Sequence, residues 1–192
     1  QFSQQAGGQV LELIKEDIRP SDILTKQAFE NAITLHAAVA GSTNALLHIP
    51  AIAHEVGIEI EPELFDEIHR RTPYLANVIP SGEYACELLW YAGGVPAVME
   101  EIKDLLHLDV MTVTGKTLGE NLEEMKKTGF IEECREKLQE DYDILASEIL
   151  KTRNKPLSDE GAVAILKGNL APEGAVVKHS AVAKEMRQHV GP

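Results

Sequence analysis

The stretch Ala40-Gly41-Ser42-Thr43-Asn44 separates two apolar runs, and the rest of the chain is organised around it. The run before it places apolar side chains at helical spacing, and a second run, Ala45-Leu46-Leu47-His48-Ile49, follows directly. This pattern predicts a turn between two helices. We expect Gly41 to end the first helix with a positive φ, and one of the three polar residues after it to cap the second helix.

Such a turn has two possible roles. Most Ser, Thr and Asn residues at the start of a helix only cap it, and capping alone explains this stretch. The same turn also suits a carboxylate or a phosphate, because backbone N–H groups and the positive end of the helix dipole meet there. From the residues of the turn alone, the capping interpretation is favoured over the anion site.

Several short motifs surround this turn and cover nearly the whole chain. In order, they are Ala28-Phe29-Glu30-Asn31-Ala32-Ile33, Gly41-Ser42-Thr43-Asn44-Ala45, Ala51-Ile52-Ala53-His54-Glu55, Pro80-Ser81-Gly82, Ala92-Gly93-Gly94-Val95-Pro96-Ala97-Val98, Thr112-Val113-Thr114-Gly115-Lys116-Thr117-Leu118 and Leu166-Lys167-Gly168-Asn169-Leu170-Ala171-Pro172-Glu173-Gly174-Ala175-Val176-Val177-Lys178. In this order they resemble the dihydroxy-acid dehydratase / phosphogluconate dehydratase family. We therefore expect the chain to be an internal fragment of such an enzyme, which agrees with its start at Gln1 rather than at a methionine.

The resemblance implies an α/β fold. It places residues 1–108 in the mainly helical later half of an N-terminal catalytic domain. Residues 109–155 are expected to form a connector with a short strand and acidic helices, and residues 156–192 the first strands of a C-terminal β-rich domain.

Hydrophobic spacing predicts the individual elements. We expect helices over 9–17, 21–39, 45–56, 62–71, 83–92 and 95–108, and amphipathic helices within 120–148 after a capping box of Thr117 and Glu120. Strands are expected over 110–114, 162–166 and 175–178, with an irregular crossing over 74–82 and a loose or helical end over 181–190. The apolar residues 37–40 are expected to be buried.

Composition excludes several classes of partner. The formal net charge of −13 argues against nucleic acid and against an anionic membrane surface, both of which attract basic proteins. Cys86 and Cys134 have neither a zinc spacing nor a disulfide framework, so we expect reduced, packed thiols in a cytoplasmic protein. His48 and His54 are six residues apart and do not share a helix face, so we interpret them as structural or surface residues rather than metal ligands.

The family resemblance also implies chemistry. Such enzymes dehydrate 2,3-dihydroxy acids or sugar acids to 2-keto-3-deoxy acids, using an iron–sulfur cluster as Lewis acid, Mg²⁺ and a serine base. The resemblance places those groups outside these residues, so we expect no catalytic residue and no ligand to the cluster or to Mg²⁺ here. The fragment alone should be inactive, and the intact protein should be a homodimer acting on a small acid.

What this chain can supply is the wall of the substrate pocket. Ser42, Thr43 and Asn44 are the first candidates, Ser81 with Gly82 the second, and Gly168 with Asn169 the third. For each of these three loops, the alternative explanation is that its residues only form a turn.

Two departures from the family pattern bear on these expectations. Trp90-Tyr91 stands where branched-chain enzymes typically have His-Arg, which is similar to members that act on sugar acids. Ala40 stands where a glycine often precedes Gly-Ser-Thr-Asn. The alternative function is a non-catalytic helical interaction module that keeps the dehydratase scaffold.

Overall fold

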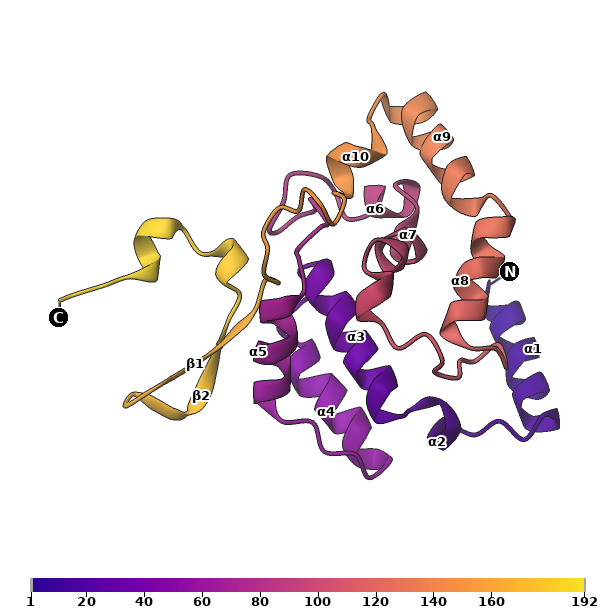
Figure 1. Ribbon diagram of the computed structural model, residues 1–192, viewed down its shortest axis with the longest axis horizontal. Coiled ribbons are helices and arrows are strands. Elements are labelled where there is room, and N and C mark those ends of the chain that lie inside the picture. The colour runs from indigo at the N-terminus through magenta and orange to yellow at the C-terminus, as the bar shows by residue number, and fades with distance from the viewer. Residues whose placement is uncertain (1, 192) are drawn as a thin grey trace.

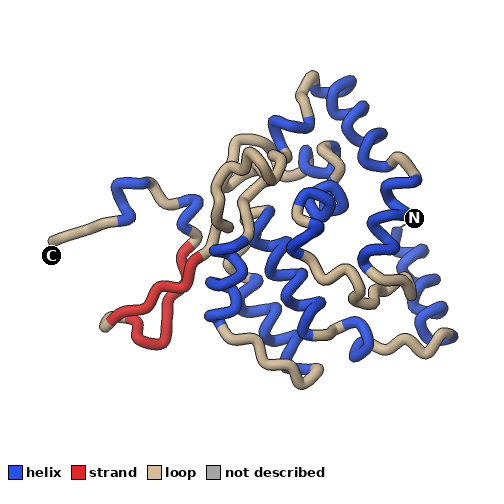
Figure 2. Tube along the Cα trace, in the orientation of Figure 1, coloured by secondary structure: helices blue, strands red, loops and turns tan. Residues whose placement is uncertain are grey.

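A computed structural model describes residues 2–191, apart from the side chains of Phe2 and Lys184. It has an α/β fold that is mostly helical and carries a two-stranded antiparallel hairpin at one side (Figures 1 and 2). The helices are α1 (Phe2–Lys15), α2 (Pro20–Ile23), α3 (Lys26–Ala38), α4 (Ala45–Glu55), α5 (Pro62–Arg71), α6 (Leu88–Tyr91), α7 (Gly94–Glu101), α8 (Leu118–Lys127), α9 (Phe130–Tyr142) and α10 (Ala146–Ile149), and the strands are β1 (Ala164–Gly168) and β2 (Ala171–Val177). Short 3₁₀ turns cover Lys103–Leu105, His179–Ala181 and Lys184–Arg187.

One hydrophobic core lies between α3, α4 and α5, which stand side by side in Figure 1. Phe65 and Ile68 are three residues apart on α5, so they share a helix face, and both are completely enclosed. They pack with Ile33 of α3 and Ala53 of α4. This core fixes the angle between the helices on either side of the turn at residues 40–44.

A second core surrounds the extended segment 74–78. Leu75 donates its amide to the carbonyl of Ala38 at 2.8 Å, and Ala76 pairs with Leu150 in an isolated bridge. Helices α6, α7 and α9 cover this segment with apolar side chains. The predicted irregular crossing is therefore confirmed, and the buried state of Ala37, Ala38 and Ala40 is confirmed with it.

The predicted helix over 21–39 is wrong in its first part. The chain forms the short α2 and then restarts as α3, whose N-cap is Thr25. The Thr25 hydroxyl accepts a hydrogen bond from the amide of Ala28 at 3.2 Å, which satisfies one of the free donors of the first turn. Helix α1 also differs: it begins at Phe2 and runs through Gly7-Gly8, since a glycine costs a helix only about 1 kcal/mol.

Three other predicted elements are shorter than expected. The helix over 83–92 is reduced to α6, because Tyr84 donates to and accepts from the backbone of residues 77–79 instead of joining a helix. The helix over 95–108 ends at Glu101 and continues only as a 3₁₀ turn. In place of a strand over 110–114, there is a single bridge between Met111 and Thr117.

The hairpin contains more of the chain than predicted. β1 and β2 pair with Ala164 opposite Val177 and Gly168 opposite Ala171, with an irregularity between Leu166 and Gly168. The predicted break at residues 172–174 lies inside β2, where Gly174 adopts a φ of +112° that other residues rarely reach. Figure 1 shows the hairpin projecting from the helical body beside α5.

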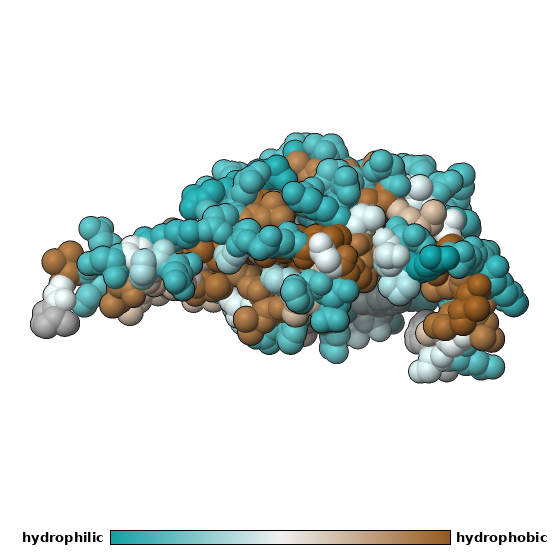
Figure 3. Space-filling view, turned by 90° about the horizontal axis from the view of Figure 1, so that it is seen from below, coloured by the Kyte–Doolittle hydropathy of each residue, from teal (hydrophilic) through white to brown (hydrophobic). Residues whose placement is uncertain are grey.

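The acidic helices agree with the sequence. Thr117 and Glu120 form the predicted capping box at the start of α8, and α9 buries Ile131, Cys134 and Leu138. Apolar side chains nevertheless interrupt the hydrophilic surface in Figure 3, including the end of the molecule where α1 lies. Within residues 2–191, none of the helices combines the length and apolar character that crossing a membrane requires.

Candidate functional site

The turn after α3 has the hydrogen bonds of a Schellman motif, but Ala40 rather than Gly41 occupies its left-handed position. The amide of Gly41 donates to the carbonyl of His36 at 2.9 Å, and the amide of Ala40 donates to that of Ala37 at 3.3 Å. The residue in the left-handed region is Ala40, with a φ of 51°, so the prediction that Gly41 takes a positive φ is wrong. Ala40 occupies the position that usually requires glycine.

Gly41 is required for a different reason. A Cβ atom at this position would lie 2.1 Å from Cδ2 of His36, which is inside any allowed contact distance. The imidazole therefore packs directly against the backbone of the turn. In that position its Nε2 lies 2.8 Å from the carbonyl oxygen of Ser42.

His36 belongs to a directional chain of hydrogen bonds that involves α5 and the hairpin. The amide of Val163 donates to Nδ1 of His69 at 3.1 Å, so the proton of His69 is on Nε2. Nε2 of His69 donates to Nδ1 of His36 at 3.0 Å, which leaves Nε2 of His36 to donate to Ser42. The backbone donor at one end and the backbone acceptor at the other fix both tautomers.

Both imidazoles are neutral in this chain. The pKa of His69 is lowered to about 3, mainly by burial. Repulsion from His36 and His179 lowers this pKa further, whereas the carboxylate of Asp66 raises it. Burial also lowers the pKa of His36, against the hydrogen bond to Ser42, which raises it. A proton on either ring would repel its neighbour and break the donor order of the chain.

The N-cap position of α4 is Asn44, and no described side chain makes a capping hydrogen bond to the first turn of this helix. Oγ of Ser42 accepts the amide of Asn44 at 3.3 Å, while the Asn44 side chain makes no capping bond. The amides of residues 45, 46 and 47 donate to the carbonyls of residues 42, 43 and 44, respectively. Among the described residues, the amides of Ser42 and Thr43 are therefore the ones in this turn without a partner.

The turn faces a cavity of about 490 Å³, so its polar groups are not sealed inside the protein. Ser42 and Thr43 line it together with Lys178, whose Nζ is bound to the same turn at Ala40, and most of the other lining residues are apolar. The apolar wall consists of Leu35, Val39, Val78, Ile79, Pro80, Leu89 and Val95, together with Cys86. A hydroxyl-bearing edge, an ammonium and an apolar wall can hold a small acid with a hydrocarbon part.

Lys178 is the site residue that sequence reasoning missed. Its Nζ donates to the carbonyl of Ala40 at 2.7 Å, from the residue that follows β2. Burial lowers its pKa, and no described carboxylate lies within 4.0 Å of it. The signal was a lysine directly after a β-branched run, but nothing in the sequence shows that it reaches a turn 138 residues earlier.

The other candidate loops lie elsewhere. Ser81 lines a separate cavity of about 510 Å³, and Gly82 packs so closely against Asn77 that a Cβ would lie 2.3 Å from its carbonyl carbon. Gly168 and Asn169 form the exposed tip of the hairpin. The structure thus brings Ser42 and Thr43 together with Lys178, but not with the second or third loop.

The aromatic pair Trp90-Tyr91 and the two histidines of α4 lie away from the cavity at Ser42. Trp90 stacks edge-on against Phe130 at 5.3 Å between ring centres, and Tyr91 lies against Tyr142. Neither Trp90 nor Tyr91 lines the cavity at Ser42, so their position offers no direct contact to a ligand there. His48 and His54 are exposed on α4, which agrees with a surface role.

Two family models match the chain. Residues 1–121 match "Dihydroxy-acid/6-phosphogluconate dehydratase N-terminal" and residues 148–192 match the C-terminal model of the same family. The chain belongs to this dehydratase family. The two matched parts contact each other at α5, where the amide of Val163 donates to His69 and the amide of Ile165 donates to Asp66.

Curated dehydratase relatives align along the chain. The dihydroxy-acid dehydratase of Ruminiclostridium cellulolyticum is 48% identical over 100% of this chain, and that of Methanosarcina barkeri 45%. The dihydroxy-acid dehydratase of Syntrophobacter fumaroxidans is 49% identical over 95% of the chain. The chain spans about a third of the length of these relatives, with 32%, 32% and 30% of each covered.

The cofactors expected for a dehydratase do not fit the residues of this chain. Cys134 is buried in α9, where burial raises the pKa of its thiol, whereas Cys86 is exposed in the turn before α6 and is not the packed helical thiol we expected. Iron–sulfur clusters are held by several cysteine thiolates, and Mg²⁺ by oxygen ligands such as carboxylates. Within residues 2–191, no three His, Cys, Asp or Glu side chains are grouped so that they could hold a metal.

Proposed function

We propose that the intact protein is a hydro-lyase that dehydrates a sugar acid or a 2,3-dihydroxy acid to a 2-keto-3-deoxy acid, and that this chain forms part of the substrate-pocket wall. The observation that carries the proposal is the meeting of Ser42, Thr43 and Lys178 at one cavity. A carboxylate between them would accept hydrogen bonds from the free amides and hydroxyls and from the ammonium.

The electrostatics of the cavity favour an acid. Nζ of Lys178 is partly withdrawn from water, and among residues 2–191 its hydrogen-bond partner is the neutral carbonyl of Ala40. A hydrogen bond that involves a charged group contributes about 1.5–3 kcal/mol, and the low dielectric of a half-buried site strengthens the attraction. The apolar wall opposite would contact the carbon skeleton of the acid.

Hydrogen bonds from buried histidines hold the turn at the edge of the cavity in place. His36 donates to the carbonyl of Ser42, so the amide of Thr43, which lies in the same trans peptide plane, points away from the imidazole. Because His36 is in turn held by His69 and by the backbone of Val163, the pocket edge depends on the junction with the hairpin. We propose that His36 and His69 are positioning residues for this edge.

Steady-state kinetics on the intact protein tests the proposed carboxylate site. Thr43→Val and Lys178→Met should each raise KM or lower kcat about tenfold, the equivalent of losing about 1.4 kcal/mol of substrate or transition-state binding. Assays should use dihydroxy-isovalerate and a panel of aldonic acids. Thr152→Val and Lys155→Met are matched controls, because both residues are exposed and line none of the cavities described above. Unchanged kinetics in both site variants, with an unchanged unfolding midpoint, would refute the carboxylate site.

The remaining family properties complete the proposal. An iron–sulfur cluster and Mg²⁺ would be held by parts of the protein outside this chain, and the enzyme would be a cytoplasmic homodimer that binds neither nucleic acid nor membrane. The division into residues 1–108, 109–155 and 156–192 belongs to the same proposal. Iron, sulfide and magnesium analysis of the intact protein, sedimentation, and limited proteolysis test these points separately.

The alternative is a helical interaction module without catalysis. The side chains of Leu47 and Ile52 on α4 favour it, because these apolar side chains are 73% and 49% exposed. Dehydratase activity of the intact protein against any acid in the panel would exclude a purely non-catalytic role. Complete absence of activity in cluster-loaded protein would favour the module.

A further inference from the structure

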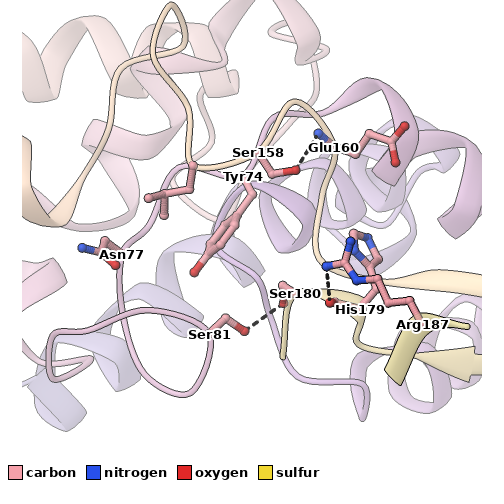
Figure 4. A pocket seen from close by; sticks show the side chains of 9 residues that line it. Tyr74, Asn77, Ser81, Ser158, Glu160, His179, Ser180 and Arg187 are labelled. Carbon is pink, nitrogen blue, oxygen red and sulfur yellow. Dashed lines mark hydrogen bonds between the residues drawn. The ribbon is translucent and has the colours of Figure 1, made fainter. Parts of the chain in front are cut away.

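The second cavity, of about 510 Å³, is lined mostly by hydroxyl and amide side chains. It lies between the segment 74–81, the loop 157–160 and the residues after β2, so three distant parts of the chain enclose it (Figure 4). Its lining consists of Tyr74, Asn77, Ser81, Leu157, Ser158, Glu160, His179, Ser180 and Arg187. None of these residues lines the cavity at Ser42.

Tyr74 contributes to this cavity a buried hydroxyl that has no partner within residues 2–191. The residue is 4% exposed, and its hydroxyl makes no hydrogen bond to any described residue. Figure 4 shows the ring pointing from the segment 74–78 toward the space beside Ser81. A buried hydroxyl without a partner is costly, and buried tyrosine hydroxyls usually have one. A polar group of a molecule in the cavity would supply the partner that this hydroxyl lacks among the described residues.

The other polar groups are arranged around the same space. The hydroxyls of Ser81 and Ser180 lie 2.9 Å apart and join the two sides of the cavity. Ser158 uses its oxygen to accept the amide of Glu160, which leaves its O–H proton available. Each hydroxyl can both donate and accept a hydrogen bond, so the cavity offers a ligand donors and acceptors side by side.

The charges of the lining balance. Arg187 contributes a guanidinium, whose Nη2 donates to the carbonyl of His179 at 3.1 Å, and Glu160 contributes a carboxylate. A cavity lined by one such pair attracts neither a strong anion nor a strong cation. The ring of Tyr74 and the side chain of Leu157 supply the apolar contacts that C–H groups need.

We propose that this cavity is a binding site for a small polyol, a short carbon chain with neighbouring hydroxyl groups. One ligand hydroxyl bonds with the hydroxyl of Tyr74, and the next ones replace or extend the Ser81–Ser180 pair. The polyol chain is the shared chemistry of a neutral sugar alcohol and of an aldonic acid, and the test separates these two sources. The site is independent of the acid site proposed at Ser42.

Calorimetric titration of the intact protein with xylitol and, separately, with xylonate tests the site. We expect xylitol to bind at this cavity alone, whereas xylonate also binds at the acid site proposed at Ser42. Tyr74→Phe should weaken xylitol binding at least fivefold. Phenylalanine fills the same space, so the variant should fold, and the loss of an unpaired hydroxyl should keep or raise its unfolding midpoint without ligand. Ser81→Ala should weaken binding independently, and Tyr142→Phe is the matched control, since Tyr142 is half-exposed on α9.

The outcomes separate the two proposed sites. Xylitol binding that is lost in Tyr74→Phe and kept in Thr43→Val supports the polyol site. No xylitol binding, or binding unchanged in both Tyr74→Phe and Ser81→Ala, overturns it. If xylonate alone binds, and Thr43→Val rather than Tyr74→Phe abolishes that binding, the polyol site is wrong and the acid site at Ser42 stands.

Discussion

At the scale of the residue, the turn at 40–44 has alanine at the position whose backbone favours glycine, and glycine at the position that follows. Ala40 has the left-handed backbone that favours glycine, and Gly41 has an ordinary φ but no room for a Cβ. The left-handed region costs an alanine about 1–2 kcal/mol, and the burial of the Ala40 methyl returns about 0.8 kcal/mol. The side chain of His36, rather than the backbone, therefore explains why Gly41 is needed.

Two substitutions separate these effects. Gly41→Ala should lower the free energy of unfolding by about 3 kcal/mol, because the new methyl displaces His36 from a buried hydrogen bond. Ala40→Gly should change it by less than about 1 kcal/mol, since relief of the backbone offsets the lost methyl. Urea denaturation measures both. Gly7→Ala is the control for the added methyl: a Cβ there meets nothing within 4 Å, and its place inside α1 should raise the free energy of unfolding by up to about 1 kcal/mol. Equal effects at 40 and 41 would contradict the assignment.

At the scale of the element, α5 is the helix that holds the hairpin. Three backbone amides of the strand region bond to it in succession: Gly161 to the carbonyl of His69 at 2.7 Å, Val163 to Nδ1 of His69 at 3.1 Å, and Ile165 to Oδ1 of Asp66 at 2.9 Å. The spacing of two residues follows from the pleat of an extended chain, in which alternate amides face the same side. The same histidine thus docks β1 and orients His36.

Gly161 controls this docking. A Cβ at this position would lie 2.6 Å from Nδ1 of His69 and 2.8 Å from Cβ of Ala37, so Gly161→Ala should push the strand off α5. We expect hydrogen exchange at the amides of Val163 and Ile165 to accelerate at least tenfold, equivalent to about 1.4 kcal/mol, while α8 and α9 keep their protection. Gly168→Ala at the open hairpin tip is the control. Unchanged exchange at both amides would show that the strand is held by other contacts.

At the scale of the whole molecule, two hydrophobic cores and one polar junction stabilise the fold. The core between α3, α4 and α5 and the core around residues 74–78 both border α3. The neutral pair of His36 and His69 lies at the junction of these cores with the hairpin. The charges that act on the pair come from Lys178, His179 and Asp66, and the net effect of burial and charge keeps both rings unprotonated.

This pair predicts how stability depends on pH. The unfolded chain protonates each histidine near pH 6.5, whereas folded His69 takes its proton only at about 3, so the unfolded state binds more protons between these values. The free energy of unfolding should therefore decrease as the pH falls below 6.5, by up to about 1.4 kcal/mol per pH unit for each histidine. Above pH 6.5 this contribution is complete and constant.

Urea midpoints at pH 7.5, 6.5, 5.5 and 4.5 measure the slope. His69→Gln should flatten it, because a glutamine amide can accept from Val163 and donate to His36 without titrating. His54→Gln, an exposed residue of α4, should leave the slope unchanged. An equally steep slope in His69→Gln would assign the pH dependence to other groups.

Local sequence signals predicted the elements that depend on neighbours along the chain. The capping box of Thr117 and Glu120, the apolar face of α5 and the turn at Gly41-Ser42-Thr43 all follow from spacing and side-chain type. The motif order also led to the family that the comparisons show. The elements that were wrong, such as the helix over 83–92, are those whose backbone bonds go to a distant segment instead.

The sequence by itself determined which turn carries exposed hydroxyls and amides, because capping chemistry is local. Only the tertiary structure decided what faces that turn: Lys178 reaches Ala40 from 138 residues away, and His36 and His69 meet across 33 residues. It also divided Ser42 and Ser81 between two cavities. The physical reason is that hydrogen bonds and charges act over a few ångströms in space, and that separation along the chain does not specify separation in space until the cores are packed.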